Sequence, residues 1–351
     1  MSNCLSLINL QSLPEFDNHC LVTFNFDKKS SLLGFIAIHR FRSDFPSFGA
    51  TRLWNYPSLV EALKDALRLS KTMSYKAALA NLPVGGAKAV LISNENLSNK
   101  NKELLLSEYA KRVSYLSGKF ITGSDVGLSK DDIKKLKKCS PYFVGTKVNP
   151  EKYTALGLLY SIKSGLKFLY GKDNLEERSI AILGVGKVGG ELLRLLYRCT
   201  KKIVISDIKE ELVEKMVREY KGVKVVKPNL IYKEKVDVFS PCALSGCISS
   251  SNIKRLNFKL IVGGANNQLE SEDLAEKLYK RGILYAPDYV VNAGGLISVY
   301  DEYRYKKPSL KRIENKISKI AKVLEKIFEE SQRLRKSTLE VANKMAEKVI
   351  N

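Results

Sequence analysis

Two lysines are the residues of this 351-residue chain whose type and setting most suggest chemistry. Lys76 lies among alanines and leucines, and Lys88 stands directly before the apolar run Ala-Val-Leu-Ile. A lysine in an apolar pocket beside another cation has a lowered pKa and can act as a base at neutral pH. The alternative is that both lysines are solvated at element ends, because lysine is seldom buried without a partner. Between them, Pro83 and Gly85-Gly86 predict a turn that opens into a strand over 89–92.

Residue types that support other chemistry are scarce or scattered. The two histidines, His19 and His39, both lie in the N-terminal segment, which disfavours a Ser-His-Asp or histidine–metal mechanism. The six cysteines form no CxxC pair, so we expect no disulfide framework and no bound metal. The chemistry that remains is that of lysine and carboxylate side chains.

Composition limits the class of protein. A hydrophobic content of 44% supports a large core and about two domains. No run approaches the roughly 20 apolar residues of a membrane helix, and no signal-peptide pattern begins the chain. We therefore expect a cytoplasmic protein with no membrane partner. The net charge of +22 would suit a nucleic-acid surface, but the charges are spread out and no recognition motif accompanies them, so we expect no specific nucleic-acid partner.

A glycine-rich segment predicts a dinucleotide site. The apolar strand 180–183 runs into the spacing GxGxxG over 184–189, and a helix follows over 191–198. The first glycine allows a tight turn, the second lets the backbone approach a pyrophosphate, and the third lets helix and strand pack closely. Asp207 ends the next strand, where a carboxylate would bind ribose hydroxyls and repel a 2′-phosphate, so NAD is favoured over NADP. The alternative is a glycine-rich turn beside a surface aspartate. The expected NAD-binding residues here are Gly184, Val185, Gly186, Lys187, Val188, Gly189 and Asp207.

The elements that must position these residues differ between the two halves of the chain. From Ser179, short apolar strands alternate with charged helices, which predicts a parallel, doubly wound sheet. Before that point, a helix begins near the capping residue Ser58 and runs toward Lys76. Other expected N-terminal elements are strands over 20–26 and 33–39, a helix over 102–116, and a strand that enters a loop over 120–127. Helices are also expected over 154–169 and 309–351.

Several ordered motifs occur between Gly34 and Ile350. They are Phe48-Gly-Ala-Thr-Arg-Leu-Trp54, Ser74-Tyr-Lys-Ala-Ala78, Gly85-Gly-Ala-Lys88, Ser124-Asp-Val-Gly127, Thr154-Ala-Leu-Gly157, Phe239-Ser-Pro-Cys-Ala-Leu244, Gly264-Ala-Asn-Asn-Gln268 and Ala286-Pro-Asp-Tyr-Val-Val-Asn-Ala-Gly-Gly295. In these motifs the chain resembles the glutamate/leucine/phenylalanine/valine dehydrogenase family, and it looks most like the leucine dehydrogenase branch. The resemblance implies an α/β protein of two domains: a catalytic domain with a mixed sheet over 1–150 and a Rossmann-type NAD-binding domain over 151–327. The segment 328–351 is expected to pack back on the first domain.

The resemblance also implies roles for individual residues. Lys76 would bind the α-carboxylate of an amino-acid substrate, and Lys88 and Asp125 would be the catalytic lysine and carboxylate. The residues implied to lie at the cofactor are Thr154, Ala243 and Asn266, and those at the substrate side chain are Phe48, Gly49, Asn292, Leu296 and Val299. Thr154 could instead be a helix N-cap. Arg52 and Trp54 could serve packing alone, and we leave them out of the predicted site.

Three departures from the family pattern keep alternatives open. Ala87 stands where the family usually has a third glycine, Ser124 where leucine dehydrogenases usually have glutamate, and Phe48 where a leucine is common. The first hypothesis is NAD-dependent oxidative deamination of a neutral L-amino acid, with leucine or another branched-chain amino acid preferred, by a homo-oligomer (dimer or octamer). Phe48 and Ser124 motivate an aromatic amino-acid dehydrogenase instead. Ala87, Ser124 and the basic charge motivate a catalytically silent NAD-binding regulator.

Overall fold

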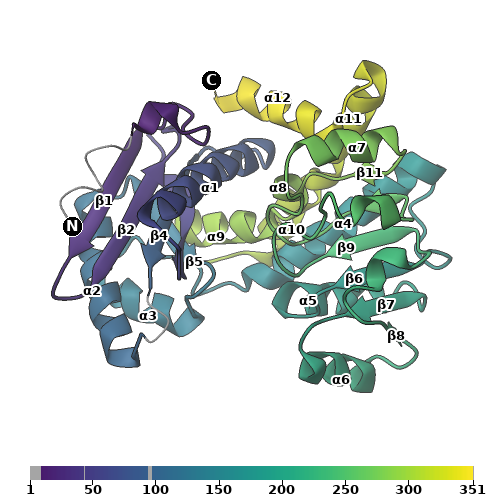
Figure 1. Ribbon diagram of the computed structural model, residues 1–351, viewed down its shortest axis with the longest axis horizontal. Coiled ribbons are helices and arrows are strands. Elements are labelled where there is room, and N and C mark those ends of the chain that lie inside the picture. Colours follow the sequence, from purple (N-terminus) through teal and green to yellow (C-terminus); the bar gives the residue numbers. More distant parts are fainter. Residues whose placement is uncertain (1–8, 43, 94–96, 351) are drawn as a thin grey trace. The chain divides into compact units, whose positions relative to one another are not determined.

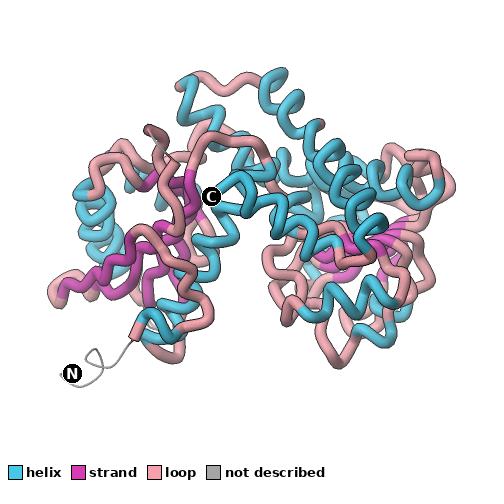
Figure 2. Tube along the Cα trace, turned by 90° about the horizontal axis from the view of Figure 1, so that it is seen from above, coloured by secondary structure: helices cyan, strands magenta, loops and turns pink. Residues whose placement is uncertain are grey.

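The chain forms two compact units in a computed structural model that describes residues 9–42, 44–93 and 97–350. The first unit comprises residues 1–148 with 349–351, and the second comprises residues 149–348. Each unit has its own sheet with helices against it (Figures 1 and 2). None of the described helices is long and apolar enough to cross a membrane.

The first unit contains a mixed five-stranded sheet. Its elements in chain order are β1 (Leu21–Asp27), β2 (Leu32–Ile38), β3 (Ser47–Trp54), α1 (Leu59–Leu79), β4 (Gly85–Ile92), α2 (Asn99–Tyr115), β5 (Phe120–Ser124) and α3 (Lys130–Cys139), after a short 3-10 turn at Leu10–Ser12. The strand order is β1-β2-β4-β3-β5. β2 is antiparallel to β1 and β4, whereas β3 is parallel to β4 and β5. The predicted mixed sheet is confirmed.

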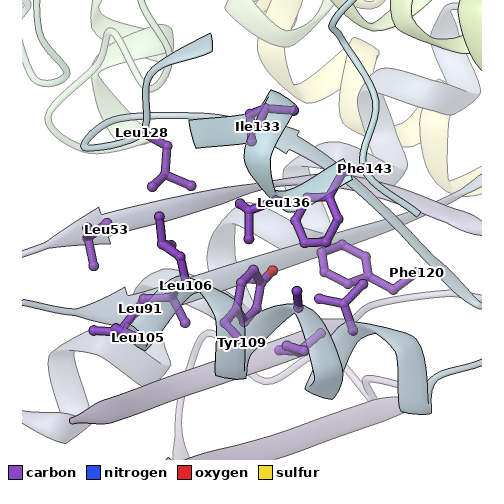
Figure 3. Close-up of a cluster of buried hydrophobic side chains, with 14 of the residues drawn as sticks. Leu53, Leu91, Leu105, Leu106, Tyr109, Phe120, Leu128, Ile133, Leu136 and Phe143 are labelled. Carbon is purple, nitrogen blue, oxygen red and sulfur yellow. The ribbon is translucent and has the colours of Figure 1, made fainter. Parts of the chain in front are cut away.

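Helices cover both faces of this sheet, and strand alternation decides which side chains each helix meets. Phe35 and Val90 pack with apolar residues of α1. Their neighbours Ile36 and Ala89 point the other way, into a core with α2 and α3. Figure 3 shows this second core, in which Tyr109 of α2 lies among leucines and phenylalanines.

The glycine turn predicted before Lys88 is wrong, because Gly85 already belongs to strand β4. The glycines there serve close packing. A Cβ on Gly85 would lie 1.9 Å from the carbonyl oxygen of Arg40, and one on Gly86 would lie 2.0 Å from the backbone nitrogen of Ser74 in α1. Ala87 lies in extended strand with its side chain fully buried in the α2–α3 core. A third glycine is therefore not required at this position, which removes one motive for a silent regulator.

The second unit is the predicted doubly wound fold. Its elements are α4 (Pro150–Tyr170), β6 (Ile180–Leu183), α5 (Lys187–Leu196), β7 (Ile203–Ser206), α6 (Glu210–Glu219), β8 (Lys224–Val225), β9 (Val238–Pro241), β10 (Leu260–Ile261), α7 (Asp273–Lys280), β11 (Leu284–Tyr285), α8 (Asp288–Val291), α9 (Gly294–Tyr305), α10 (Leu310–Ile317), α11 (Lys319–Leu334) and α12 (Thr338–Ile350). The strand order is β11-β10-β9-β6-β7-β8, and every pairing is parallel. This is the order of dinucleotide-binding Rossmann sheets. β8 was not predicted: it has only two residues, and both are exposed although Val225 is apolar.

The C-terminal segment is three helices, where one was predicted over 309–351. Ser318 separates α10 from α11, and Arg335 ends α11 in the left-handed conformation (φ 54°). α11 and α12 up to residue 348 group with the second unit. There Tyr289 donates to Asn343 Oδ1 at 2.7 Å, and Thr338 donates to the carbonyl oxygen of Tyr285. The predicted packing of 328–351 on the first domain stays a prediction.

Candidate active site

Three charged side chains of the first unit project from neighbouring parallel strands onto the face that α1 covers. In β4, Lys88 alternates with Ala87 and Ala89, which belong to the opposite core. In β3, Arg52 alternates with Thr51, whose hydroxyl contacts Tyr109 of α2 on that opposite side. Asp125 follows β5 directly, and its backbone N–H donates to the carbonyl oxygen of Thr51 at 3.1 Å. The strand register therefore brings side chains from three separate strands together.

Lys88 and Asp125 form a buried ion pair. The Lys88 ammonium donates to Asp125 Oδ2, and only 5% of Lys88 is exposed. Arg52 Nε donates to the same oxygen at 3.1 Å. Burial lowers the pKa of Lys88, and the Arg52 cation lowers it further, although the Asp125 carboxylate opposes both. Burial alone would raise the pKa of Asp125, but Lys88 and Arg52 outweigh it and keep this pKa well below its ordinary value. Asp125 is thus a carboxylate, and Lys88 loses its proton more easily than a solvated lysine.

The loop after Asp125 is fixed on both sides. Val126 accepts a backbone hydrogen bond from Leu53 at 2.9 Å. Gly127 has φ +82°, and a Cβ there would lie 1.9 Å from the carbonyl oxygen of Leu53. Lys102 donates to the carbonyl oxygen of Gly127 at 3.1 Å and to Asp132 at 2.9 Å. The carboxylate of Asp125 is therefore presented from a rigid loop.

Lys76 lies in the last turn of α1 with 9% of its surface exposed, as predicted for the end of a helical stretch. It lies about three helical turns beyond Asp65, on the same stripe of α1. Asp65 is also buried, and its carboxylate accepts from Arg52 Nη1 at 2.8 Å. The helix thus places two charged side chains in the layer that it covers.

Arg52 is the residue that the sequence analysis missed. It bridges Asp125 and Asp65, although its sequence context alone left it out of the predicted site as a residue that could serve packing. A signal was available: Asp65 interrupts the apolar face Ala62, Leu63, Ala66 and Leu67 of α1, so it needs a cationic partner on the facing strand. Trp54, which we also left out, is half exposed.

The turn from β6 to α5 has the geometry of a phosphate cradle. Gly184 has φ +91°, and a Cβ on Gly189 would lie 1.9 Å from the carbonyl oxygen of Gly184. A Cβ on Gly186 would meet nothing within 4 Å, and no side chain caps the start of α5. The N-terminal N–H groups of α5 therefore face open space, where an anion is favoured.

Asp207 closes this cradle from the end of β7. Its Oδ2 accepts the N–H of Val185 at 2.8 Å, and its Oδ1 accepts the N–H of Lys209 at 3.0 Å. Each carboxylate oxygen keeps acceptor capacity for a further hydroxyl group. The open space at Gly186 and the carboxylate of Asp207 fit a dinucleotide whose phosphates lie on α5 and whose ribose lies at Asp207.

The remaining predicted cofactor residues lie on neighbouring loops and helices of the second unit. Ala243 is exposed and lies against Gly184, since a Cβ added to Gly184 would lie 2.8 Å from the backbone nitrogen of Ala243. The side chain of Val185 is buried, that of Lys187 is exposed, and Val188 packs toward Gly264. Thr154 is not the helix N-cap, because Asn149 caps α4, and Thr154 donates to the carbonyl oxygen of Pro150 at 2.9 Å.

The predicted substrate residues divide between the units. In the first unit Phe48 is fully buried, and a Cβ on Gly49 would lie 2.0 Å from the carbonyl oxygen of Ala87. In the second unit Asn292 Nδ2 donates to Asn266 Oδ1 at 2.9 Å, and the side-chain oxygen Oδ1 of Asn292 is buried without a hydrogen-bond partner. The half-buried side chains Leu296 and Val299 are three residues apart on α9 and therefore share one face of that helix.

A dinucleotide cradle in one unit and a buried lysine–carboxylate pair in the other are typical of an oxidoreductase that uses a nicotinamide cofactor. Among the residues that the structure describes, no group of His, Cys, Asp or Glu side chains could bind a metal ion. Comparison with known proteins identifies the family. Residues 18–140 match the model of the Glu/Leu/Phe/Val dehydrogenase dimerisation domain, and residues 205–350 match that of glutamate/leucine/phenylalanine/valine dehydrogenase.

Individual relatives agree with this assignment. A leucine dehydrogenase of Bacillus cereus is 40% identical over 313 residues, which cover 87% of this chain and 84% of that protein. An L-tryptophan dehydrogenase of Nostoc punctiforme is 40% identical over 340 residues, which cover 95% of this chain and 94% of that protein. The crystal structure of L-tryptophan dehydrogenase from Nostoc punctiforme matches with a TM-score of 0.80 and 39% identity over 95% of this chain and 96% of that one. The chain belongs to the glutamate/leucine/phenylalanine/valine dehydrogenase family: it is an amino-acid dehydrogenase whose cofactor is NAD or NADP.

Proposed function

We propose that this enzyme catalyses the NAD-dependent oxidative deamination of a neutral L-amino acid, with leucine or another branched-chain amino acid as the preferred substrate. The amino acid, NAD⁺ and water give the 2-oxo acid, ammonium, NADH and a proton, and the reaction is reversible. The observation that supports the proposal most is the buried Lys88–Asp125 pair in a chain of this family. The relative named as a leucine dehydrogenase supports the substrate.

Each charged side chain has a task in this reaction. The cation of Lys76 would pair with the substrate carboxylate. NAD⁺ held at the β6–α5 turn and at Asp207 would supply the acceptor for the hydride of Cα, so that the oxidised substrate is an imine. Lys88, with its lowered pKa, would take the proton of the water that adds to this imine and later return it. Asp125 would accept a proton from the substrate ammonium and return one to the departing ammonia.

Preference for NAD over NADP rests on Asp207. Its carboxylate lies at the end of β7 and is bound to the N–H of Val185, so a 2′-phosphate at the same ribose would meet a fixed negative charge. The ratio of kcat/KM for the two cofactors tests this. A protein that used NADP as well as NAD would contradict the role of Asp207.

A second candidate is an aromatic amino-acid dehydrogenase, which the similarity to a tryptophan dehydrogenase over 95% of the chain supports. The ranking of amino-acid substrates by kcat/KM separates the two candidates. NADH formation at alkaline pH is followed with leucine, valine, isoleucine, phenylalanine and tryptophan, and the substrates are ranked by kcat/KM. If none of the five gives NADH, the proposed activity is wrong.

The role of Lys88 is tested with Lys88→Met, which keeps the length of the buried side chain. We expect kcat to fall by about 10²–10⁴, the usual contribution of a proton-transfer group, with NADH affinity unchanged. Lys111→Met is the control, because Lys111 lies on α2 with most of its side chain exposed. Loss of turnover and NADH binding together would indicate misfolding and would not support a role for Lys88 in proton transfer.

We also propose that the enzyme is a homo-oligomer, either dimer or octamer, of the cytoplasm. The match of residues 18–140 to a dimerisation domain supports the oligomer. Sedimentation at assay concentration decides it, and a monomer that turns over substrate would contradict the proposal.

A further inference from the structure

We propose that Arg52 is a positioning residue that, together with Asp65, sets the protonation of the Lys88–Asp125 pair. The proposal rests on the function proposed above, in which Lys88 must release and regain a proton. Arg52 is bound to carboxylates at both ends of its guanidinium. Its Nε donates to Asp125 at 3.1 Å and its Nη1 donates to Asp65 at 2.8 Å.

The anchor at Asp65 is itself firmly bound. Tyr56 donates to Asp65 Oδ2 and Arg68 to Oδ1, each at 2.5 Å. Burial would raise the pKa of Asp65, but the cation of Arg52, with the hydrogen bond from Tyr56 and the charge of Arg68, lowers it below the ordinary value. Burial and the neighbouring Asp65 carboxylate raise the pKa of Tyr56, so this phenol stays a hydrogen-bond donor. Asp65 is thus ionised and cannot follow Arg52 into another position without losing its other partners.

The arrangement gives Lys88 one anion and one cation on the same side. Asp125 favours the protonated lysine, whereas Arg52, which shares the same carboxylate oxygen, disfavours it. Asp65 lies behind Arg52 and again favours protonation. Arg52 contacts the pair directly, and Asp65 lies behind it with its own partners Tyr56 and Arg68. Lys76 is the further cation on the same stripe of α1. Burial lowers the pKa of Lys88 and Asp125 opposes this, so the cation of Arg52 adds to the lowering and makes proton release easier than it would be beside Asp125 alone.

This mechanism predicts that substitutions of Arg52 and Asp65, which contact each other, shift the pH midpoint of kcat/KM in opposite directions. Arg52→Met removes the cation, so the pH at which kcat/KM for the amino acid reaches half its plateau rises by about one unit. Activity then falls about tenfold at neutral pH and recovers at alkaline pH. Asp65→Asn removes the anion behind Arg52, so the same midpoint moves to lower pH. Arg52→Lys retains the charge and restores most of the midpoint, although it cannot bridge both carboxylates.

The measurement is the pH profile of kcat/KM for wild type and the three variants. The ammonium group of the substrate titrates identically in all of them, so differences report on the protein. Arg178→Met is the matched control, because Arg178 pairs with Asp237 at 3.4 Å in the second unit, at the opposite end of β6 from Gly184. It removes a comparable ion pair and leaves the midpoint unchanged.

Opposite shifts in Arg52→Met and Asp65→Asn support the inference. Shifts of the same sign, or a loss of thermal stability with an unchanged midpoint, overturn it and leave the network a purely structural one. If Arg52→Met does not fold, the direction of the shift in Asp65→Asn decides by itself. A wild-type protein that forms no NADH with any amino acid contradicts the proposed function, whereas a working wild type with unshifted variants contradicts only the role of Arg52.

Discussion

Asp125 accepts hydrogen bonds from both Lys88 and Arg52 through one carboxylate oxygen. This arrangement bears on how a buried lysine can be paired and still exchange its proton. Removing an ion from water costs several kcal/mol, which is recovered only if the ion is paired and hydrogen-bonded. Lys88, Arg52, Asp125 and Asp65 together carry no net charge when all are ionised. The group is therefore stable in the fold, yet Lys88 has a cation close enough to ease the loss of its proton.

The two histidines, His19 and His39, belong to a second buried polar network, in which burial favours the neutral form of the side chain. His39 is fully buried, its Nδ1 lies 2.9 Å from the Ser74 hydroxyl, and its Nε2 lies 3.1 Å from Asp17. His19 stacks edge-on against it at 4.9 Å. Serine, histidine and aspartate in a row resemble a hydrolytic triad, but Ser74 is only 1% exposed and cannot meet a substrate. Burial lowers the pKa of His39 to about 4, so the ring is neutral at physiological pH.

A pH dependence of stability follows from His39. Its pKa is about 4 in the folded protein against 6.5 when solvated, so protons bind the unfolded chain first as pH falls. The free energy of unfolding should therefore decrease between pH 6.5 and pH 4, by on the order of 3 kcal/mol from this residue, and level off below. Urea unfolding of wild type and His39→Gln over this range measures the difference. Parallel curves for the two proteins would show that His39 is not the group responsible.

At the scale of elements, β4 and α1 approach so closely at Gly86 that no side chain fits between them at this position. Gly86 lies against the backbone of Ser74, and this contact places Lys88 of the strand beneath the helix that carries Asp65 and Lys76. Ala87, the next residue, points to the other face and fills the core with its methyl group. Position 86 of β4 therefore requires the absence of a side chain, whereas position 87 requires a small apolar side chain.

Exchanging the residue types at these two positions tests this. Gly86→Ala should destabilise the protein by about 1–3 kcal/mol, because helix and strand must separate to admit the methyl group. It should also lower kcat, since Lys88 moves with β4. Ala87→Gly should cost about 1 kcal/mol through lost burial and added backbone freedom, with kcat little changed. Thermal unfolding measures the stability of both variants, and steady-state kinetics measures their kcat. A higher kcat in Ala87→Gly would contradict the conclusion that a third glycine is not required at position 87.

The β6–α5 turn has a similar contrast between two glycines. Gly186→Ala adds a methyl group to open space in the protein, but at the position where a pyrophosphate would approach the backbone. We expect a stability change within about 0.5 kcal/mol and a weakening of NADH binding by about tenfold or more. Gly189→Ala should instead destabilise the fold, because its Cβ would lie 1.9 Å from the carbonyl oxygen of Gly184. Calorimetric titration measures the NADH affinity of each variant, and thermal unfolding measures its stability. An unchanged NADH affinity in Gly186→Ala would contradict the proposal that the pyrophosphate binds at this turn.

At the scale of the whole molecule, each unit supplies one part of the chemistry on its own sheet. The mixed sheet carries the proposed acid–base residues Lys88 and Asp125, and the parallel sheet carries the proposed NAD cradle at the carboxyl ends of β6 and β7, the edge at which doubly wound sheets bind their ligands. The net charge of +22 is the excess of 59 lysines and arginines over 37 aspartates and glutamates. Other lysines are neutralised in local ion pairs on exposed helices, such as Lys134 with Asp131 and Lys344 with Glu340. Such pairs contribute little stability, whereas the excess positive charge favours solubility.

The sequence by itself determined the parts whose requirements are local. The spacing of Gly184, Gly186 and Gly189 and the acid at Asp207 predicted the cradle, because a tight βα turn and a helix N-terminus are formed by consecutive backbone groups. The alternation of strands and helices predicted the parallel sheet, whereas the mixed sheet was implied by the family resemblance. β3, α3, β8 and the breaks near Ser318 and Arg335 were not predicted.

Only the tertiary structure decided how the charged residues combine. Arg52 and Asp125 are 73 residues apart, and they meet because β3 lies parallel between β4 and β5 with alternate side chains on the face that α1 covers. The same packing showed that Gly85-Gly86-Ala87 is a strand and no turn. Burial and partnership depend on strand register and on which helix covers which face, and these are properties of the folded chain. Lys76 and Lys88 were visible as candidates in the sequence, whereas the contact between Arg52 and the carboxylate partner of Lys88 was visible only in the folded chain.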